Sequence, residues 1–128
     1  MKLYIIALLT AFLPMSSFAS EALPSLNYKT ARCSFLKGGK VIETRSGALM
    51  SLVIDESIGR FVQLKLEESG HRIQYQLLIE DAQSKGTGII VLQNLAVDGV
   101  ESSAEFSTSS VSWVRLAQGE YSIQCDLN

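Results

Sequence analysis

Runs in which apolar and polar residues alternate fill most of the chain from residue 28 onwards. A period of two is typical of β-strands with one buried face, and no stretch of this region has a convincing helical period. Two-residue turns that contain glycine separate many of the runs, which is a strong hairpin signal. The pattern predicts eight strands, over residues 28–36, 41–54, 60–68, 71–79, 88–97, 100–107, 111–117 and 120–126.

The turn at Ser69-Gly70 predicts a hairpin whose register follows from the alternation of apolar and polar residues. A two-residue loop fixes which residues face each other, and facing residues share one face of the sheet. The expected apolar pairs are Leu66 with Ile73, Leu64 with Tyr75 and Val62 with Leu77. The expected pairs on the polar face are Glu67 with Arg72, Lys65 with Gln74 and Gln63 with Gln76.

Three other turns predict further pairs in the same way. A turn at Gln118-Gly119 pairs Leu116 with Tyr121, Val114 with Ile123, Ser112 with Cys125 and Trp113 with Gln124. A turn at Gly38-Gly39 pairs Leu36 with Val41, Phe35 with Ile42 and Cys33 with Thr44, and a five-residue turn at 55–59 pairs Leu52 with Val62 and Met50 with Leu64. Another turn is expected at Asp98-Gly99.

The first nineteen residues have a different pattern. A positive start at Lys2 precedes an apolar run over residues 3–13, and the small residues Ser17 and Ala19 follow. This layout is typical of a secretory signal peptide, and the run is too short to span a bilayer, which needs ~20 residues. We expect a signal peptide at 1–19, a flexible lead-in at 20–27 and a single β domain at 28–128, located in the periplasm or outside the cell.

Export changes the interpretation of the two cysteines. An even pair in a short exported chain indicates one disulfide, Cys33–Cys125, and both residues fall on the apolar faces of their predicted strands. The first and last strands must then be neighbours or face each other across a thin core. Because nearly every connection is a short hairpin, we expect a small antiparallel up-and-down barrel of about eight strands. The alternative is a two-sheet β-sandwich with the disulfide between its layers.

The expected interior is crowded. An eight-stranded barrel is just wide enough to be filled by side chains or to hold one small ligand. The predicted inward residues are large: Phe35, Met50, Leu52, Leu64, Leu66, Tyr75, Leu77, Val91, Leu95, Phe106, Leu116, Tyr121 and Ile123. A packed core is therefore favoured over the cavity of a lipocalin-like carrier. A small outer-membrane barrel is a remote alternative, because few aromatic residues are available for two interfacial girdles.

Charge and motifs exclude several classes of function. The chain has a formal net charge of −2, and about −3 without the predicted signal peptide, with no basic cluster for nucleic acid. There is no nucleophile elbow, phosphate-binding glycine loop or dinucleotide fingerprint. His71 is the only histidine, and the neighbouring acidic pairs at 55–56, 67–68 and 80–81 fit solvated turns. We expect no enzyme activity, no metal and no cofactor.

Several apolar residues are predicted to point outwards, away from the core. They are Leu36, Val41, Leu49, Val53, Phe61, Leu78, Ile90, Leu92 and Trp113. Scattered exposed apolar residues are normal, whereas a contiguous patch marks a partner site in which an aromatic residue often anchors the contact. The candidate partner-binding residues are Trp113, Phe61, Leu78 and Leu92.

The layout of a small exported β domain with cysteines in its first and last strands is similar to that of periplasmic inhibitors of lysozymes and proteases. In the lysozyme inhibitors of the c-type class, a Ser-Gly pair is closely followed by tyrosine. Here Ser69-Gly70 is present, but Tyr75 comes later and is predicted to point inwards, so no site residue is transferred. The resemblance implies an inhibitor of an extracytoplasmic hydrolase that acts through protein–protein contact. We expect a monomer with an unidentified protein partner.

Overall fold

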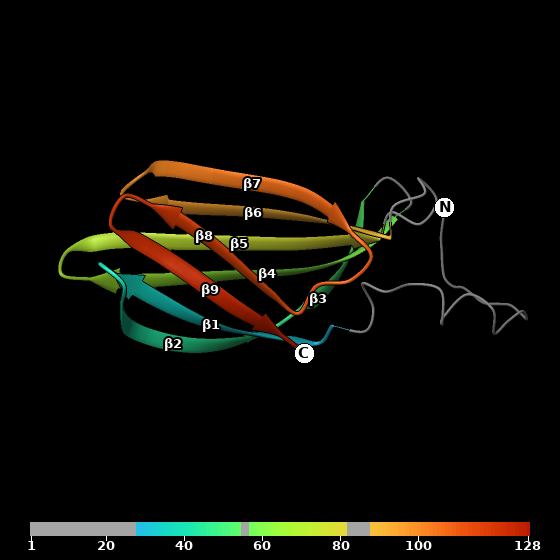
Figure 1. The fold of residues 1–128 in the computed structure, drawn as a ribbon, viewed down its shortest axis with the longest axis horizontal. Helices are drawn as coiled ribbons and strands as arrows, with labels where there is room; N and C mark the ends of the chain where they lie inside the picture. Colours follow the sequence, from blue (N-terminus) through green and yellow to red (C-terminus); the bar gives the residue numbers. More distant parts are fainter. Residues whose placement is uncertain (1–27, 55–56, 82–87) are drawn as a thin grey trace, which may run out of the picture.

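The computed structural model describes residues 28–54, 57–81 and 88–128, and these ranges contain nine β-strands (Figure 1). None of the described residues forms a helix that could cross a membrane. The predicted signal peptide and lead-in lie outside the described residues. The strands are β1 (Thr30–Lys37), β2 (Lys40–Ala48), β3 (Met50–Ile54), β4 (Ser57–Glu68), β5 (His71–Asp81), β6 (Ile89–Val97), β7 (Val100–Thr108), β8 (Trp113–Gln118) and β9 (Tyr121–Leu127).

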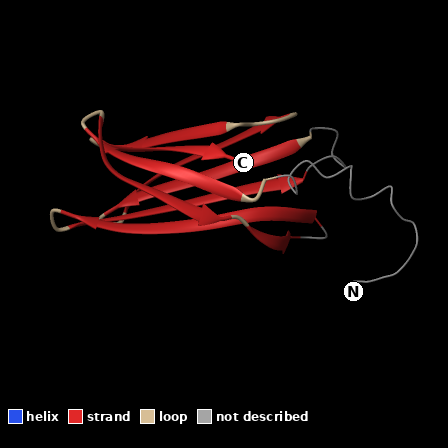
Figure 2. Cartoon of the chain, turned by 90° about the horizontal axis from the view of Figure 1, so that it is seen from below, coloured by secondary structure: helices blue, strands red, loops and turns tan. Residues whose placement is uncertain are grey.

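The strands form two antiparallel sheets. One sheet has the order β2-β1-β9-β8 and the other has the order β3-β4-β5-β6-β7, and Figure 2 shows them as two layers. The all-β class and the Cys33–Cys125 disulfide are confirmed. The expectation of a closed barrel is wrong, because the two sheets do not join into one ladder, and the two-sheet sandwich alternative describes the structure. The disulfide does not lie between the layers, because it joins β1 and β9, which are neighbours in one sheet.

The chain changes sheets at Leu49, which is why the barrel does not close at this point. The predicted strand 41–54 is divided there into β2 in one sheet and β3 in the other. Leu49 is buried rather than outward, and its N–H donates to the carbonyl of Lys29 at 2.8 Å. The apolar run around Leu49 gives no alternation from which this change could be predicted.

Successive strands still follow one another around the sandwich, so the predicted meander order is retained. The backbone ladder between described strands stops at two places, between β2 and β4 and between β7 and β8, which we call the seams. Side chains bridge both of them. The guanidinium of Arg45 donates to the carbonyl of Lys65 at 2.6 Å, and the amide of Gln93 donates to the carbonyl of Arg115 at 3.4 Å.

The β4–β5 hairpin has the predicted register, including all six predicted pairs. Its turn residues Ser69 and Gly70 have φ of 52° and 82°. A two-residue turn with positive φ at both positions matches the twist of the flanking strands, so the short loop determines the pairing.

The other predicted registers need correction. The β8–β9 turn pairs Gln118 with Tyr121, a two-residue shift that keeps every side chain on its predicted face but pairs Leu116 with Ile123, Val114 with Cys125 and Trp113 with Asp126. In β1–β2, Leu36 pairs with Val41 as predicted, but a bulge then pairs Phe35 with Glu43 and Cys33 with Arg45. β3 and β4 pair Ile54 with Ser57, so Leu52 lies opposite Gly59 and Met50 opposite Phe61.

The core lies between the sheets. Nine of the predicted inward residues are buried: Phe35, Leu64, Leu66, Tyr75, Leu77, Val91, Leu95, Tyr121 and Ile123. Leu116 is half-buried against them. Met50, Leu52 and Phe106 are exposed. Met50 and Leu52 belong to the outer face, so their prediction as inward residues is wrong. The corrected β3–β4 register explains the exposure of Met50 and Leu52, because it pairs them with residues of the outer face. Phe106 lies opposite the buried Val91, but it is exposed because β7 is an edge strand at a seam.

Candidate partner-binding surface

A row of apolar side chains crosses the five-stranded sheet. Met50 in β3 lies opposite Phe61 in β4, which lies opposite Leu78 in β5, which lies opposite Leu92 in β6. Alternate residues of these strands, such as Val62, Leu77 and Val91, are buried in the core. The row therefore belongs to the outer face of the sheet, because successive side chains of a strand point to opposite faces.

A second row extends the apolar surface. It aligns Leu52, Gly59, Glu80 and Ile90 across β3 to β6. Gly59 has no side chain, and a Cβ atom there would lie only 3.2 Å from Cδ1 of Leu78, so Leu78 leans over the glycine. The two rows make a continuous surface, which we call the outer apolar strip, formed by Met50, Leu52, Phe61, Leu78, Ile90 and Leu92.

The strip is accessible to a partner. Met50 is 68% exposed and Leu52 is 40% exposed, whereas the other four members are half-buried. A shallow hollow of about 470 Å³ adjoins the strip. Its lining includes Phe61, Leu78 and Leu92 on the apolar side and Gln76, Asn94, Ser103 and Glu105 on the polar side. The fold thus brings together three of the four candidate residues, whose binding role stays a prediction.

Trp113, the fourth candidate, does not join the strip. It belongs to β8 in the other sheet, where it is 56% exposed. A groove of about 670 Å³ beside it is also lined by Phe106, Val111, Val114 and Leu116, at the seam between β7 and β8. Trp113 thus lies in a different sheet from the other three candidate residues, and its binding role stays a prediction.

Charged and aromatic side chains gather where the tight hairpins turn. Nδ1 of His71 lies 2.6 Å from a carboxylate oxygen of Asp98, and the other oxygen accepts the N–H of Arg72 at 2.9 Å. The hydroxyl of Tyr121 donates to Glu68 at 3.2 Å, and the rings of His71 and Tyr121 meet edge to face at 5.8 Å. This network joins the β4–β5, β6–β7 and β8–β9 hairpins.

The network shifts the pKa of several members. The backbone N–H of Arg72 and then the His71 ring stabilise the charged form of Asp98, so the pKa of this carboxyl is lowered. The hydroxyl of Ser69 and then that of Tyr121 lower the pKa of Glu68. Desolvation and then the bond to Glu68 raise the pKa of Tyr121. Each shift favours the ionisation state in which the hairpins are held together.

Within the described part of the chain, no nucleophile is hydrogen-bonded to the His71–Asp98 pair. Nucleophilic catalysis requires a hydroxyl or thiol within reach of the imidazole. No serine, threonine or cysteine of the described residues is hydrogen-bonded to His71, and the hydroxyl of Ser69 donates to Glu68 instead. Nor do the described histidine, cysteine and acidic residues form a group that could hold a metal ion. The predicted acidic pair at 55–56 lies outside the described residues.

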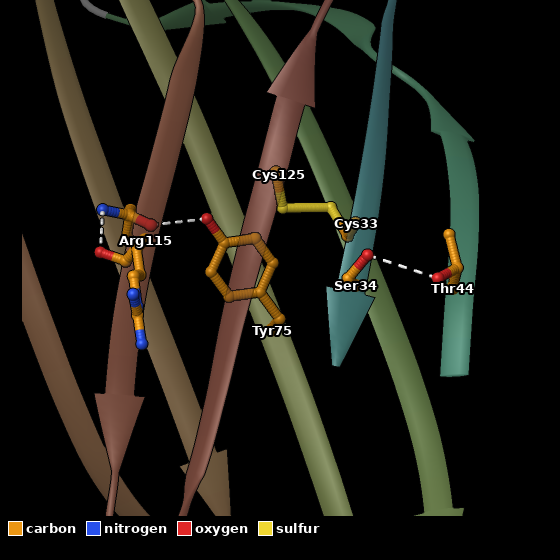
Figure 3. Close-up of a disulfide and its surroundings, with 7 residues drawn as sticks. Cys33, Ser34, Thr44, Tyr75, Arg115 and Cys125 are labelled. Atoms are coloured by element: carbon orange, nitrogen blue, oxygen red, sulfur yellow. Dashed lines mark hydrogen bonds between the residues drawn. A yellow bond between two sulfur atoms is a disulfide. The ribbon is translucent and has the colours of Figure 1, made fainter. Parts of the chain in front are cut away.

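The disulfide joins the first and last strands directly. Cys33 in β1 lies opposite Cys125 in β9, with 4.0 Å between their Cα atoms, and both residues are fully buried (Figure 3). Tyr75 belongs to the surroundings of the disulfide that Figure 3 draws. Its hydroxyl donates to Oε1 of Gln93 at 2.6 Å. Burial raises the pKa of this phenol far above its ordinary value, which keeps it a neutral donor.

Comparison with known proteins assigns no family: no family model, no curated protein and no solved structure matches the chain.

Three features of the structure are not predicted from the sequence. Met50 and Leu52 belong to the strip because the β3–β4 turn is shorter than the predicted five residues. Gln93 is 5% exposed and occupies an inward position between Val91 and Leu95. A polar residue at an inward position of an apolar alternation is the signal in the sequence that indicates a buried hydrogen bond. No local pattern in β2 indicates that Arg45 reaches β4, because that contact depends on how the sheets stack.

Proposed function

We propose that the protein is an exported, non-enzymatic binding module that captures a protein partner through the outer apolar strip. The observation that carries this proposal is the alignment of Met50, Phe61, Leu78 and Leu92 across four strands. Aligned apolar side chains on the solvent face of a sheet have no role in that sheet's own core. A contiguous apolar patch rimmed by polar residues is typical of a protein-interaction site.

Two observations support export to the periplasm or the medium. Residues 1–19 have the layout of a signal peptide. The buried disulfide is consistent with an oxidising compartment outside the cytoplasm. Among exported binding modules, inhibitors of extracytoplasmic hydrolases share the layout of this chain, so inhibition of such an enzyme is the specific form of binding that we propose.

A lipocalin-like carrier of a small apolar ligand is the alternative function, and the core does not favour it. Phe35, Tyr75 and Ile123 fill the space between the sheets and are almost completely inaccessible to solvent. A carrier needs an interior cavity for its ligand. The accessible apolar surface lies instead on the outside of the five-stranded sheet.

Native mass spectrometry of the protein recovered from its own cells tests the proposal. The expected chain begins at Ser20 and is two hydrogens lighter than the reduced form, and it carries a protein-sized additional mass. Leu92→Ser should reduce the fraction in that complex, whereas Val100→Ser should leave it unchanged, because Val100 is 58% exposed outside the strip. An increment of a few hundred daltons would favour the carrier, and equal complex formation by both variants would contradict a role for the strip.

A further inference from the structure

We infer that the partner presents a basic apolar segment to the outer apolar strip, with lysine or arginine side chains beside its apolar contact residues. This inference rests on the proposed function, since it names the chemistry that the same surface would recognise. The argument comes from the charged residues that share rows with the strip.

Among the described residues, the two charged side chains that share rows with the strip are both negative. Glu105 in β7 lies directly opposite Leu92 and so ends the first row. Glu80 in β5 lies between Gly59 and Ile90 in the second row. The two carboxylates belong to strands that are separated by one strand, so they are roughly 10 Å apart across the sheet.

Neither carboxylate is neutralised within the described part of the chain. The ion pairs found there involve Glu43, Glu67, Glu68 and Asp98, and none includes Glu80 or Glu105. The basic residues on the outer positions of this sheet, Lys65 and Arg72, pair with Gln74 and Glu67 in rows closer to the tight hairpins. A partner that covers the strip would therefore meet two carboxylates without a cation.

The row between the strip and the basic residues is uncharged. It aligns Gln63, Gln76, Asn94 and Ser103. Asn94 lines the hollow, and its amide nitrogen donates to Glu101 at 2.8 Å and to Ser103 at 2.9 Å. The side-chain oxygen of Asn94 is then the group left to accept a hydrogen bond. Lysine and arginine carry only donors, so they complement this acceptor as well as the carboxylates.

Charge complementarity separates this partner from the other possible occupants. An anionic lipid surface would be repelled by Glu80 and Glu105. A second copy of this chain, placed strip to strip, would bring like charges together with no cation in these rows to offset them. Like charges that face each other across an interface disfavour binding, whereas opposite charges fix its register and raise the association rate.

Titration of the isotope-labelled protein with two matched probe peptides tests the inference. Both probes are short helical peptides with a leucine stripe, and they differ only in that one carries lysines and the other glutamates beside the stripe. The lysine peptide should shift the methyl resonances of Leu78 and Leu92, and the glutamate peptide should bind at least about fivefold more weakly. The variant Glu80→Gln with Glu105→Gln should lose about fivefold in affinity for the lysine peptide, because two exposed ion pairs are removed.

The matched control replaces Glu120 in the β8–β9 turn by glutamine and Asp126 in β9 by asparagine, because both carboxylates lie outside the five-stranded sheet. This variant should bind the lysine peptide like the wild type. Equal binding of both peptides at the strip, or an unchanged affinity of the Glu80/Glu105 variant, would overturn the inference but leave the strip as a binding surface. Shifts at Leu78 and Leu92 on raising the protein concentration alone, or with vesicles of anionic lipid, would overturn it in favour of self-association or lipid.

Failure of the proposed function would give a different result. If neither peptide shifts Leu78 or Leu92 and no protein complex is recovered from cells, the strip is not a binding surface. If a complex depends on Leu92 in cells while neither peptide binds, the proposed function stands and the basic partner is wrong.

Discussion

The guanidinium of Arg45 in β2 donates a hydrogen bond to the backbone carbonyl of Lys65 in β4, across a seam where the two sheets are not joined by a ladder. At the opposite seam, the amide of Gln93 in β6 donates to the carbonyl of Arg115 in β8. Side chains thus satisfy edge carbonyls that a closed barrel would satisfy with backbone N–H groups. The meander order is that of a barrel, but the contacts at the seams are those of a sandwich.

Tyr75→Phe should weaken the seam at Gln93. The change keeps the ring but removes the hydroxyl that donates to Oε1 of Gln93, and Gln93 is 5% exposed, so water is largely excluded from this acceptor. We expect the free energy of unfolding to fall by about 1–3 kcal/mol, as measured by urea denaturation. Ser34→Ala is the control, because it removes an exposed hydroxyl contact with Thr44 and should cost less than about 0.5 kcal/mol. Equal costs for the two variants would contradict a structural role for the Tyr75–Gln93 bond.

Gly47→Ala should disturb the other seam. A Cβ atom at Gly47 would lie 2.8 Å from Cγ2 of Val62, which is closer than real side chains approach. We expect a loss of about 1–3 kcal/mol in the free energy of unfolding from overpacking.

Val62→Ala supplies the space that the added methyl group needs. The double variant should therefore cost less than the sum of the two single variants, in a double-mutant cycle measured by chemical denaturation. Val114→Ala is the matched control, because Val114 is also buried but lies in β8, at the opposite edge of the four-stranded sheet from Gly47 in β2. Its effect should add to that of Gly47→Ala. If the costs of Gly47→Ala and Val62→Ala simply add, the loss of stability in Gly47→Ala does not come from a clash with Val62.

Loss of the disulfide should cost a large share of the stability. Cys33 and Cys125 are separated by 92 positions. In the unfolded state the bond therefore constrains nearly all of the chain that forms the β-sandwich. The variant Cys33→Ala with Cys125→Ala should lose about 2–5 kcal/mol in guanidinium denaturation. The wild type treated with a reductant should show a similar loss, and a change below about 1 kcal/mol in both would contradict this account.

Asp98 should make the hairpin end sensitive to acid. Its folded-state pKa is lower than in the unfolded chain, so its contribution is complete above the unfolded pKa of about 3.9 and is lost as the pH falls through the lower folded value. Asp98→Asn keeps a side chain that tolerates the φ of 52° at this turn, but it removes the charge. The variant should be less stable than the wild type at neutral pH, and the difference should shrink below about pH 4. A difference that is independent of pH, in thermal melts across this range, would contradict the assignment.

The alternation of apolar and polar residues predicts strand pairing correctly where a tight turn between regular strands determines it. The β4–β5 pairing follows from a tight turn at Ser69-Gly70 between two regular alternations, so all its predicted pairs are found. Prediction fails where the sequence has no period of two, as at Leu49, and where a bulge or a turn of different length shifts the register, as at Phe35 and Met50. The openness of the seams could not be predicted, because it depends on the stacking of strands far apart in sequence.

The candidate surface was predictable in part for the same reason. The alternation predicts that Phe61 and Leu78 both point outwards, and the register of the β4–β5 hairpin pairs them. Trp113 could not be placed relative to them, since its position depends on which sheet contains β8.

Photo-crosslinking in the cells that make the protein tests the central claim most directly. Benzoylphenylalanine would replace Phe61 in the outer apolar strip or, as the control, Val41 in the four-stranded sheet, which is 59% exposed. We predict a discrete protein adduct from position 61 and none from position 41. No protein adduct from position 61, or the same adducts from both positions, would contradict a partner that docks on the strip.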